Sequence, residues 1–420
     1  MANYLLVMGR GIEGCGNTRN AIELCNYINS LNDNHCEVIS NKDVAVGRGW
    51  DQKNDITKLS FVTEYDAIKS YVDKADKIVI TSVPPKKCDE KIKENFADML
   101  KYAHANGKHL TYFQFDHRIH SICRNMYFDP KYYDIFDCFD LVVTHSYDND
   151  FSNKFLKKNN IKIKKFIARD KNINNFFSID FDAVRNEVWK KFEDKEYRSL
   201  HFLGRSAAWK GPWRVRDFHR DYLQKDGWIT RIEGIEMAIN TLEHVFDNYV
   251  PGGKKVVRPD LHLIVFNKDD SKAWAEGTYK FERNTGAYVL PPYERIAGLT
   301  HMATAMFGTE LVGLPDYISK DMIENTMFEI VASGTIPVFS KHWGDLFTIN
   351  GKPLTSFKLS ECGTLFLDEN DPERTVKMMN ALSENKEKYD KCREIAYNFY
   401  KNIFDNSVIL PQLLGLINSK

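Results

Sequence analysis

Three absences in this sequence each exclude a class of protein. No charge of one sign prevails, because 58 Lys and Arg balance 58 Asp and Glu; the chain is no histone-like polycation, and any nucleic-acid contact must come from a local basic face. Its eight cysteines form no C-x-x-C pair, which disfavours a zinc site or disulfide framework and predicts reduced, mostly buried thiols of a cytosolic protein. Long apolar runs are also missing: Tyr4–Met8 is too short for a signal peptide or membrane span and suits a buried strand.

The first half of the chain alternates short apolar runs with helical patterns. A length of 420 residues predicts two or three domains. Strands separated by helices of 10–20 residues indicate βαβ units and a parallel sheet. The predicted strands are Tyr4–Met8, Cys36–Ser40, Lys77–Ser82, Leu110–Phe115 and Phe139–Thr144, and the predicted helices are Thr18–Leu31, Ala67–Asp76 and Glu90–Asn106.

A second α/β pattern opens at about Ser199, after the polar stretch 151–198. The sequence therefore predicts an α/β protein with domains at 1–195 and 196–390. A helical segment at 391–420 follows, for which a return to the first domain is one possibility. The later elements are strands Ser199–Leu203, Leu261–Phe266, Ile336–Phe339 and Thr364–Leu367, and helices Arg214–Gln224, Glu373–Asn385 and Tyr389–Asn402.

A glycine-rich loop (9–16) follows the first strand and opens the first helix. Glycines let backbone N–H groups approach a phosphate or sugar, and the helix N-terminus adds positive potential. The loop lacks the Lys-Ser/Thr of a P-loop, and Ser40-Asn41 stands where a nicotinamide ribose needs an acid, so a dinucleotide oxidoreductase is disfavoured. A plain strand–helix turn is the alternative.

A second loop places Arg205 and Lys210 after the strand that ends at Leu203. Open α/β sheets bind ligands at the carboxyl ends of their strands, and two cations there suit a pyrophosphate. The alternative is an exposed basic loop.

Glu324 and Glu329 precede the segment Gly334-Thr335-Ile336-Pro337-Val338. A carboxylate only accepts hydrogen bonds, so it suits the vicinal diol of a ribose or sugar. Five residues set the two glutamates about 140° apart on a helix, so they face different parts of a donor. An ordinary surface helix is the alternative. Residues 231–236 and 368–371 are two further acidic segments, each expected to be a loop.

Asp116 and His117 follow the strand Leu110–Phe115. A carboxylate beside a histidine at a strand end can orient or deprotonate a hydroxyl nucleophile, although a helix cap is an equally simple reading of Asp116. Asp148-Asn149-Asp150 resembles a D-x-D metal triplet, to which we give little weight.

Taken in order, these motifs resemble the DNA α-glucosyltransferase family of T-even bacteriophages over nearly the whole chain. The segments that carry the resemblance are 11–18, 82–84, 116–125, 145–151, 204–211, 233–234, 294–295, 324–339 and 368–371. It implies the GT-B architecture, in which two Rossmann-like domains face each other across a central cleft. It also implies transfer of a sugar from a UDP-sugar to 5-hydroxymethylcytosine in duplex DNA, with retention of anomeric configuration.

The resemblance also implies roles for single residues. Asp116, with His117, is the expected catalytic pair. Donor binding is expected from Arg205, Lys210, Glu324, Glu329, Gly14, Gly16, Gly204, Glu233, Gly334 and Thr335. DNA binding is expected from Arg118, Arg124, Lys154, Lys157, Lys158, Arg214 and Arg216, unless these residues form an ordinary solvated face.

Phe115 is a departure, because the family has a histidine immediately before this aspartate. A pentose donor such as arabinose, or an already glycosylated cytosine as acceptor, therefore stays open beside glucose. No cofactor is expected to be bound permanently, the UDP-sugar is a co-substrate, and a divalent metal is possible but not required. We expect a monomer without membrane contact, in the cytoplasm of the infected bacterial host. The alternatives are a GT-B enzyme acting on a glycan, lipid carrier or protein, and a non-catalytic DNA-binding protein on a relic transferase fold.

Overall fold

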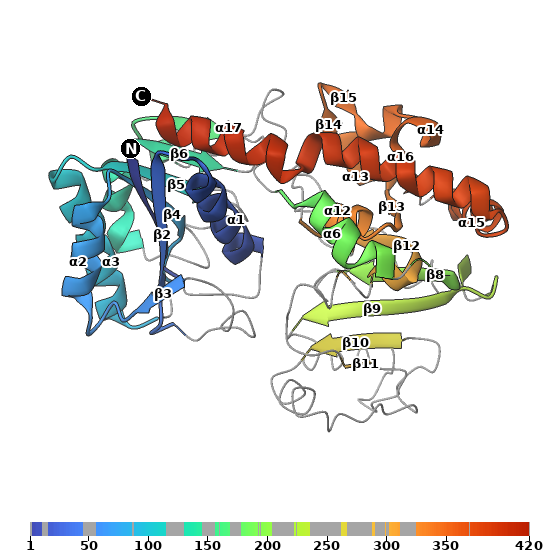
Figure 1. Ribbon diagram of the computed structural model, residues 1–420, viewed down its shortest axis with the longest axis horizontal. Helices are drawn as coiled ribbons and strands as arrows, with labels where there is room; N and C mark the ends of the chain where they lie inside the picture. The colour runs from blue at the N-terminus through green and yellow to red at the C-terminus, as the bar shows by residue number, and fades with distance from the viewer. Residues whose placement is uncertain are drawn as a thin grey trace. The chain divides into compact units, whose positions relative to one another are not determined.

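The chain folds into two compact α/β units in the computed structural model (Figure 1). Unit 1 comprises Met1–Ser178 and Asn406–Lys420, and unit 2 comprises Ile179–Asp405. The structure describes residues 2–10, 16–44, 56–85, 88–114, 130–144, 156–158, 160–168, 178–191, 193, 195–203, 222–223, 225–235, 262–266, 288–289, 299, 302–310, 325–368 and 370–419.

Unit 1 is built on a seven-stranded parallel sheet in the order β3-β2-β1-β4-β5-β6-β7. The five strands predicted for the first half are confirmed. β3 and β7 are additional; they are short edge strands without a long apolar run. The strands are β1 (Ala2–Met8), β2 (Asn34–Asn41), β3 (Ile56–Leu59), β4 (Lys77–Ser82), β5 (His109–Gln114), β6 (Leu141–Thr144) and β7 (Phe166–Ala168). The main helices are α1 (Gly16–Ser30), α2 (Tyr65–Lys74) and α3 (Glu90–Ala105), with the 3-10 helix η3 (Pro130–Cys138) before β6.

The core of unit 1 explains why these runs become strands. Leu6, Val7 and Val79 are fully buried because the sheet is covered on both faces, as parallel sheets require. Aromatic residues fill the space between sheet and helices, where the rings of Tyr112 and Phe139 stack with centroids 5.5 Å apart.

Unit 2 repeats this plan with a seven-stranded parallel sheet in the order β11-β10-β9-β8-β12-β13-β16. Its strands are β8 (Glu196–Leu203), β9 (Ile229–Ile235), β10 (His262–Phe266), β11 (Tyr288–Val289), β12 (Ala305–Glu310), β13 (Ile336–Ser340) and β16 (Leu365–Leu367). β14 (Thr348–Ile349) and β15 (Lys352–Pro353) form a separate hairpin. The helices are α6 (Phe181–Glu187), η4 (Trp189–Lys191), α12 (Asn325–Ala332), α13 (Lys341–Leu346), η7 (Leu354–Ser356), α14 (Leu359–Cys362), α15 (Pro372–Ser383) and α16 (Lys386–Phe404). The predicted α/β class with parallel sheets is thus confirmed.

One element of unit 2 corrects a sequence-based expectation. Residues 231–236 were expected to form an acidic loop, but 229–235 form β9, in which Glu233 pairs with Leu203 on one side and Ile264 on the other. The β-branched residues Ile229, Thr230, Ile232 and Ile235 favour the extended conformation. The predicted loop at 368–371 is confirmed at its described residues Asp368, Asn370 and Asp371, and Asp371 caps α15 there.

The division between the units differs from the sequence-based boundary at 195/196. Residues 179–195 belong to unit 2 because α6 is tied to α16: Arg185 donates to both carboxylate oxygens of Glu394, and the Phe181 N–H donates to the Asp405 carboxylate at 3.1 Å. The last helix, α17 (Asn406–Asn418), belongs to unit 1. There the Tyr4 hydroxyl donates to Asn418 at 3.0 Å.

Six cysteines fall within the described ranges, and all six are free thiols, five of them buried. This agrees with the expectation of reduced, mostly buried cysteines. Among the helices that the structure describes, none is long and apolar enough to span a membrane.

Candidate functional site

The carboxyl-terminal end of β1 holds the start of the glycine-rich loop against the sheet. The Gly9 N–H donates to the Ser82 carbonyl at 2.9 Å, and the Asn41 amide donates to the Gly9 carbonyl at 3.1 Å. A Cβ on Gly9 would lie 2.7 Å from the Phe96 ring, so only glycine fits. Beyond the loop, α1 begins at Gly16. A helix N-terminus at this edge suits a phosphate or another anion.

The strand leading to the predicted catalytic pair ends at this same edge. β5 ends at Gln114 and is separated from β1 only by β4, so the ends of β1 and β5 are about 10 Å apart. The sheet therefore brings the glycine-rich loop and the chain preceding Asp116 together. Asp116 and His117 themselves lie outside the described residues, as do Gly14, Arg118, Arg124 and Lys154.

Lys157 and Lys158 reach a different part of unit 1. Both are exposed, and the N–H of Lys162 soon after them donates to Asp137 at 3.2 Å. Asp137 precedes β6, so this segment approaches β7 from the amino-terminal side of the sheet. Their predicted DNA contact stays a prediction.

In unit 2, the predicted donor residues flank two elements at the carboxyl-terminal edge. β8 ends at Leu203, directly before Gly204 and Arg205, and α12 begins at Asn325, directly after Glu324. Because α12 connects the parallel strands β12 and β13, its N-terminus lies at the edge where β8 and β12 end. Gly204, Arg205, Lys210, Glu324, Arg214 and Arg216 are outside the described residues. Glu329 is partly exposed in the second turn of α12, and Glu233 lies near the carboxyl end of β9.

Gly334 and Thr335 lie at the opposite end of α12. They precede β13 and therefore stand at the amino-terminal edge of the sheet. Thr335 is 1% exposed, and its hydroxyl donates to the Met302 carbonyl at 2.6 Å. Their predicted contact with the donor does not fit this place in the fold. Both residues instead anchor the C-terminal end of α12.

Gly334 has a strict steric requirement. Its φ is +74°, and a Cβ there would lie 2.3 Å from the Trp189 ring. We expect Gly334→Ala to lower the free energy of unfolding by about 2–4 kcal/mol, about 1 from the left-handed backbone and the rest from overpacking.

Gly227→Ala is the matched control for this substitution. Gly227 lies in the same unit at φ +77°, but a Cβ there would meet nothing within 4 Å. It should lose only about 1 kcal/mol in the same denaturant titration. Equal losses in the two variants would contradict the Trp189 contact.

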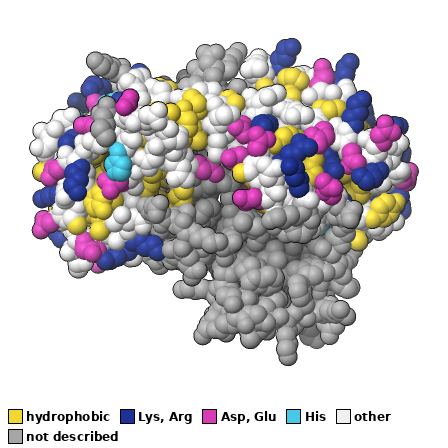
Figure 2. Space-filling view, in the orientation of Figure 1, with side chains coloured by type: hydrophobic (Ala, Val, Ile, Leu, Met, Phe, Trp, Pro, Cys, Tyr) yellow, Lys and Arg dark blue, Asp and Glu magenta, His cyan; other side chains and the backbone are white. Residues whose placement is uncertain are grey.

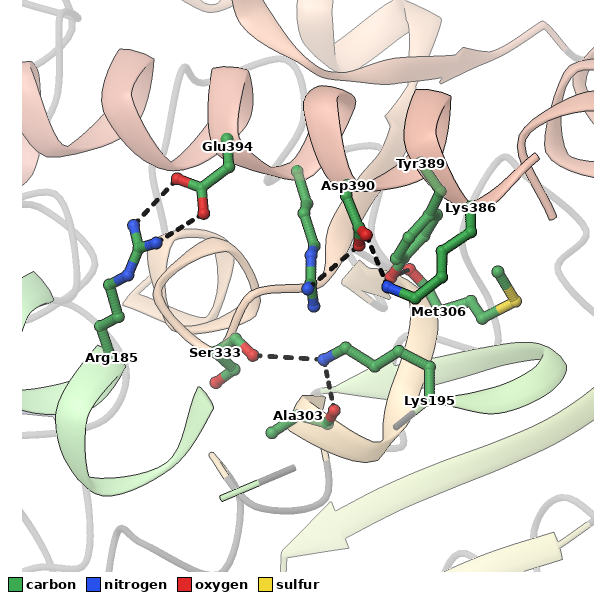
Figure 3. A network of polar contacts seen from close by, with 10 residues as sticks. Arg185, Lys195, Ala303, Met306, Ser333, Lys386, Tyr389, Asp390 and Glu394 are labelled. Carbon is green, nitrogen blue, oxygen red and sulfur yellow. Dashed lines mark hydrogen bonds and ion pairs between the residues drawn. The ribbon is translucent and has the colours of Figure 1, made fainter. Parts of the chain in front are cut away.

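Lys195 lies beside Ser333, next to Gly334 at the C-terminal end of α12. It has no acidic hydrogen-bond partner among the described residues. Its amine donates to the carbonyl of Ala303 and, at 3.5 Å, to that of Ser333 (Figure 3). Burial of the amine, aided by the Arg393 guanidinium and opposed by Asp390, lowers the pKa of Lys195 to about 7. Two ion pairs lie near it: Arg185 with Glu394 joins α6 to α16, and Lys386 with Asp390 is a pair within α16.

This pKa shift predicts a pH dependence of stability. Between pH 7 and the ordinary value of 10.5, the unfolded chain carries a proton on Lys195 that the folded chain lacks. Unfolding then takes up a proton, so raising the pH stabilises the folded state by about 1.4 kcal/mol per pH unit. Relative to Lys195→Met, the wild type should gain about 2 kcal/mol of unfolding free energy from pH 7 to 9. A pH-independent difference would show that Lys195 titrates normally.

Sequence reasoning missed Lys195 and Trp189. No local signal marks either residue, because their importance comes from packing against α12, far along the chain.

The described residues hold no evident metal site, and the face drawn in Figure 2 shows no strongly basic patch over them. Within the described ranges, no cluster of three or more His, Cys, Asp or Glu residues could hold a metal ion. On the face drawn in Figure 2, basic and acidic side chains are interspersed over the described part of both units.

Comparison with known proteins identifies relatives along the whole chain. Residues 15–252 and 277–387 match the family model of DNA alpha-glucosyltransferase. The DNA alpha-glucosyltransferase of Enterobacteria phage T4 is 27% identical over 425 residues, covering 98% of each chain. A solved alpha-glucosyltransferase in complex with UDP-glucose and DNA containing an abasic site aligns over 100% of both chains with a TM-score of 0.80 at 25% identity. A UDP-forming trehalose-phosphate synthase from Burkholderia xenovorans shares the fold at a TM-score of 0.55 and 11% identity, covering 100% of this chain and 99% of its own.

Proposed function

We propose that this chain, which belongs to the DNA alpha-glucosyltransferase family, transfers glucose from UDP-glucose to 5-hydroxymethylcytosine in duplex DNA. The similarity to the phage T4 enzyme carries the proposal, because it extends over 98% of each chain. Two relatives of the same fold were solved with DNA, one containing an HMU base and one an abasic site. The abasic complex also contains UDP-glucose.

The two units divide the task between them. Unit 2 supplies the donor residues: Arg205 and Lys210 for the diphosphate after β8, and Glu324 and Glu329 at α12 for the sugar and ribose. Charge-assisted hydrogen bonds to the diphosphate stabilise the leaving group as its charge develops. Unit 1 supplies Asp116, with His117, at the carboxyl-terminal edge that also holds the glycine-rich loop with Gly14 and Gly16. We assign domain roles accordingly, with DNA on unit 1 and donor on unit 2.

The modified base must leave the duplex stack to reach these groups, which costs a few kcal/mol. Its hydroxyl oxygen forms a bond to the anomeric carbon while the bond to the UDP oxygen breaks. We propose retention of configuration, with the hydroxyl proton passing to the departing phosphate oxygen on the same face and Asp116 orienting the acceptor.

A single assay tests this function. The protein is incubated with UDP-glucose or a UDP-pentose such as UDP-arabinose, and with DNA carrying cytosine, 5-hydroxymethylcytosine or glucosylated hydroxymethylcytosine. The DNA is then digested to nucleosides, and their masses are measured by mass spectrometry. A hexose added only to hydroxymethylcytosine is the expected result. Transfer of a pentose alone, or transfer only to the glucosylated base, would replace the proposed substrate while retaining the reaction.

Two further outcomes would contradict the proposal. If UDP-glucose is consumed only with a glycan, lipid carrier or protein acceptor, the enzyme is not a DNA transferase. If DNA binds but UDP gives no thermal shift and no transfer occurs, the chain is a binding protein on a transferase fold.

DNA affinity should fall steeply with salt, because contacts to phosphates release counterions.

A further inference from the structure

The C-terminal end of α12 is fixed by three neighbouring contacts. Lys195 donates to the carbonyls of Ser333 and Ala303, the Thr335 hydroxyl donates to Met302, and the Trp189 ring packs against Gly334. All of them lie before the first residues of β8, β12 and β13, at the edge of the sheet away from the proposed donor residues. Any effect of these contacts on the donor residues must therefore pass through α12.

Helix α12 is short and stiff enough to transmit a displacement along its axis. Its eight residues span about 12 Å, and Glu329 lies one turn before the residue that Lys195 holds. The two residues are linked directly, since the Ser333 N–H and hydroxyl both donate to the Glu329 carbonyl, at 3.1 and 2.8 Å. A shift of Ser333 therefore moves Glu329.

We propose that Lys195 is a positioning residue for the nucleotide sugar: by holding Ser333 and Ala303 together, it sets the place of α12 and thus of the carboxylate of Glu329. The inference rests on the proposed function, in which Glu329 contacts the donor. Among the described residues, the charged groups that act on this amine are Arg393 and Asp390, both on α16. Protonation of Lys195 places a second cation beside Arg393, which disfavours the arrangement that holds α12.

Lys195→Met keeps an unbranched side chain that is one atom shorter and removes both hydrogen bonds. We expect the KM for UDP-glucose to rise about tenfold, with little change in kcat or in the KM for DNA. A merely structural loss would lower the active fraction, and hence the apparent kcat, without moving either KM. Lys386→Met is the matched control, since Lys386 is an exposed lysine that pairs with Asp390 in the same network and does not contact α12 among the described contacts. Its KM values should equal those of the wild type.

The wild-type pH profile provides a second test that does not depend on the folding of a variant. The KM for UDP-glucose should rise as the pH falls from 8.5 to 6, because Lys195 becomes protonated near its pKa of about 7. UDP-glucose is the proper probe, because each of its phosphates carries one ester and one anhydride bond and so lacks the second ionisation near pH 6. Where Lys195→Met folds, it should abolish this dependence.

The outcomes separate the inference from the function beneath it. A wild type that transfers no sugar contradicts the proposed function. If the wild type transfers glucose, an unchanged donor KM in folded Lys195→Met, or a wild-type donor KM that is flat from pH 6 to 8.5, overturns the role of Lys195 alone.

Discussion

Replacement of Asp116 by asparagine is expected to lower the turnover of sugar transfer about 10²-fold, the usual cost of misplacing a reacting group that the side chain orients. The substitution keeps the shape of the side chain and removes its charge, so the affinity for UDP should stay within about twofold of the wild type. Single-turnover kinetics with hydroxymethylcytosine DNA, combined with calorimetric titration of UDP, measure the two effects separately.

Asp140→Asn is the matched control for Asp116→Asn. Asp140 precedes β6 on the same sheet, where its carboxylate accepts a hydrogen bond from the Leu110 N–H at 3.0 Å at the amino-terminal edge. Because it stands at the other end of the strands from Gln114, its loss can cost stability but should leave turnover per folded molecule near the wild-type value. Near-normal turnover in Asp116→Asn would remove Asp116 from the mechanism.

The first sheet could be predicted from the sequence because its strands are buried on both faces. Runs such as Lys77–Ser82 are rich in β-branched residues and are bounded by helical patterns, so local composition and tertiary environment agree. β9 was missed because Arg231, Glu233 and Gly234 interrupt its apolar pattern. Its identity as a strand comes from pairing with β8 and β10, which no local window contains.

The candidate site shows the same limit. Segments 9–16 and 204–211 could be singled out because each follows an apolar run, and the ends of such runs can be read from the sequence. Gly334 and Thr335 also belong to a motif that can be recognised in the sequence. That motif includes the whole of α12, so its two ends lie at opposite edges of the sheet. Glu329 lies in the half of α12 toward the edge where β8 and β12 end, whereas Gly334 meets Trp189 at the opposite edge. Only the direction of α12 between β12 and β13 shows which residues of the motif lie at the carboxyl-terminal edge and which pack at the other edge.

The other large effect is expected from Arg205→Ala, which should weaken UDP binding about 10- to 150-fold. The estimate is the 1.5–3 kcal/mol typical of a hydrogen bond to a charged group. Since β8 ends at Leu203, Arg205 is the second residue beyond the strand, where a parallel sheet presents groups to its ligand. Calorimetric titration with UDP measures this loss of affinity. Raising the salt concentration should make the difference between variant and wild type smaller, because salt screens the diphosphate charge.

Arg198→Ala makes the same substitution toward the other end of β8. There the Arg198 guanidinium donates to Glu384 and to the Asp226 carbonyl, both at 3.1 Å, and should have no part in donor binding. UDP affinity of this variant should equal that of the wild type. Titration with uridine completes the design: uridine has no phosphates, so Arg205→Ala should bind it as well as the wild type does. Equal losses for UDP and uridine would mean that Arg205 supports the nucleoside pocket rather than the diphosphate, and the assignment of the leaving-group cation would pass to Lys210.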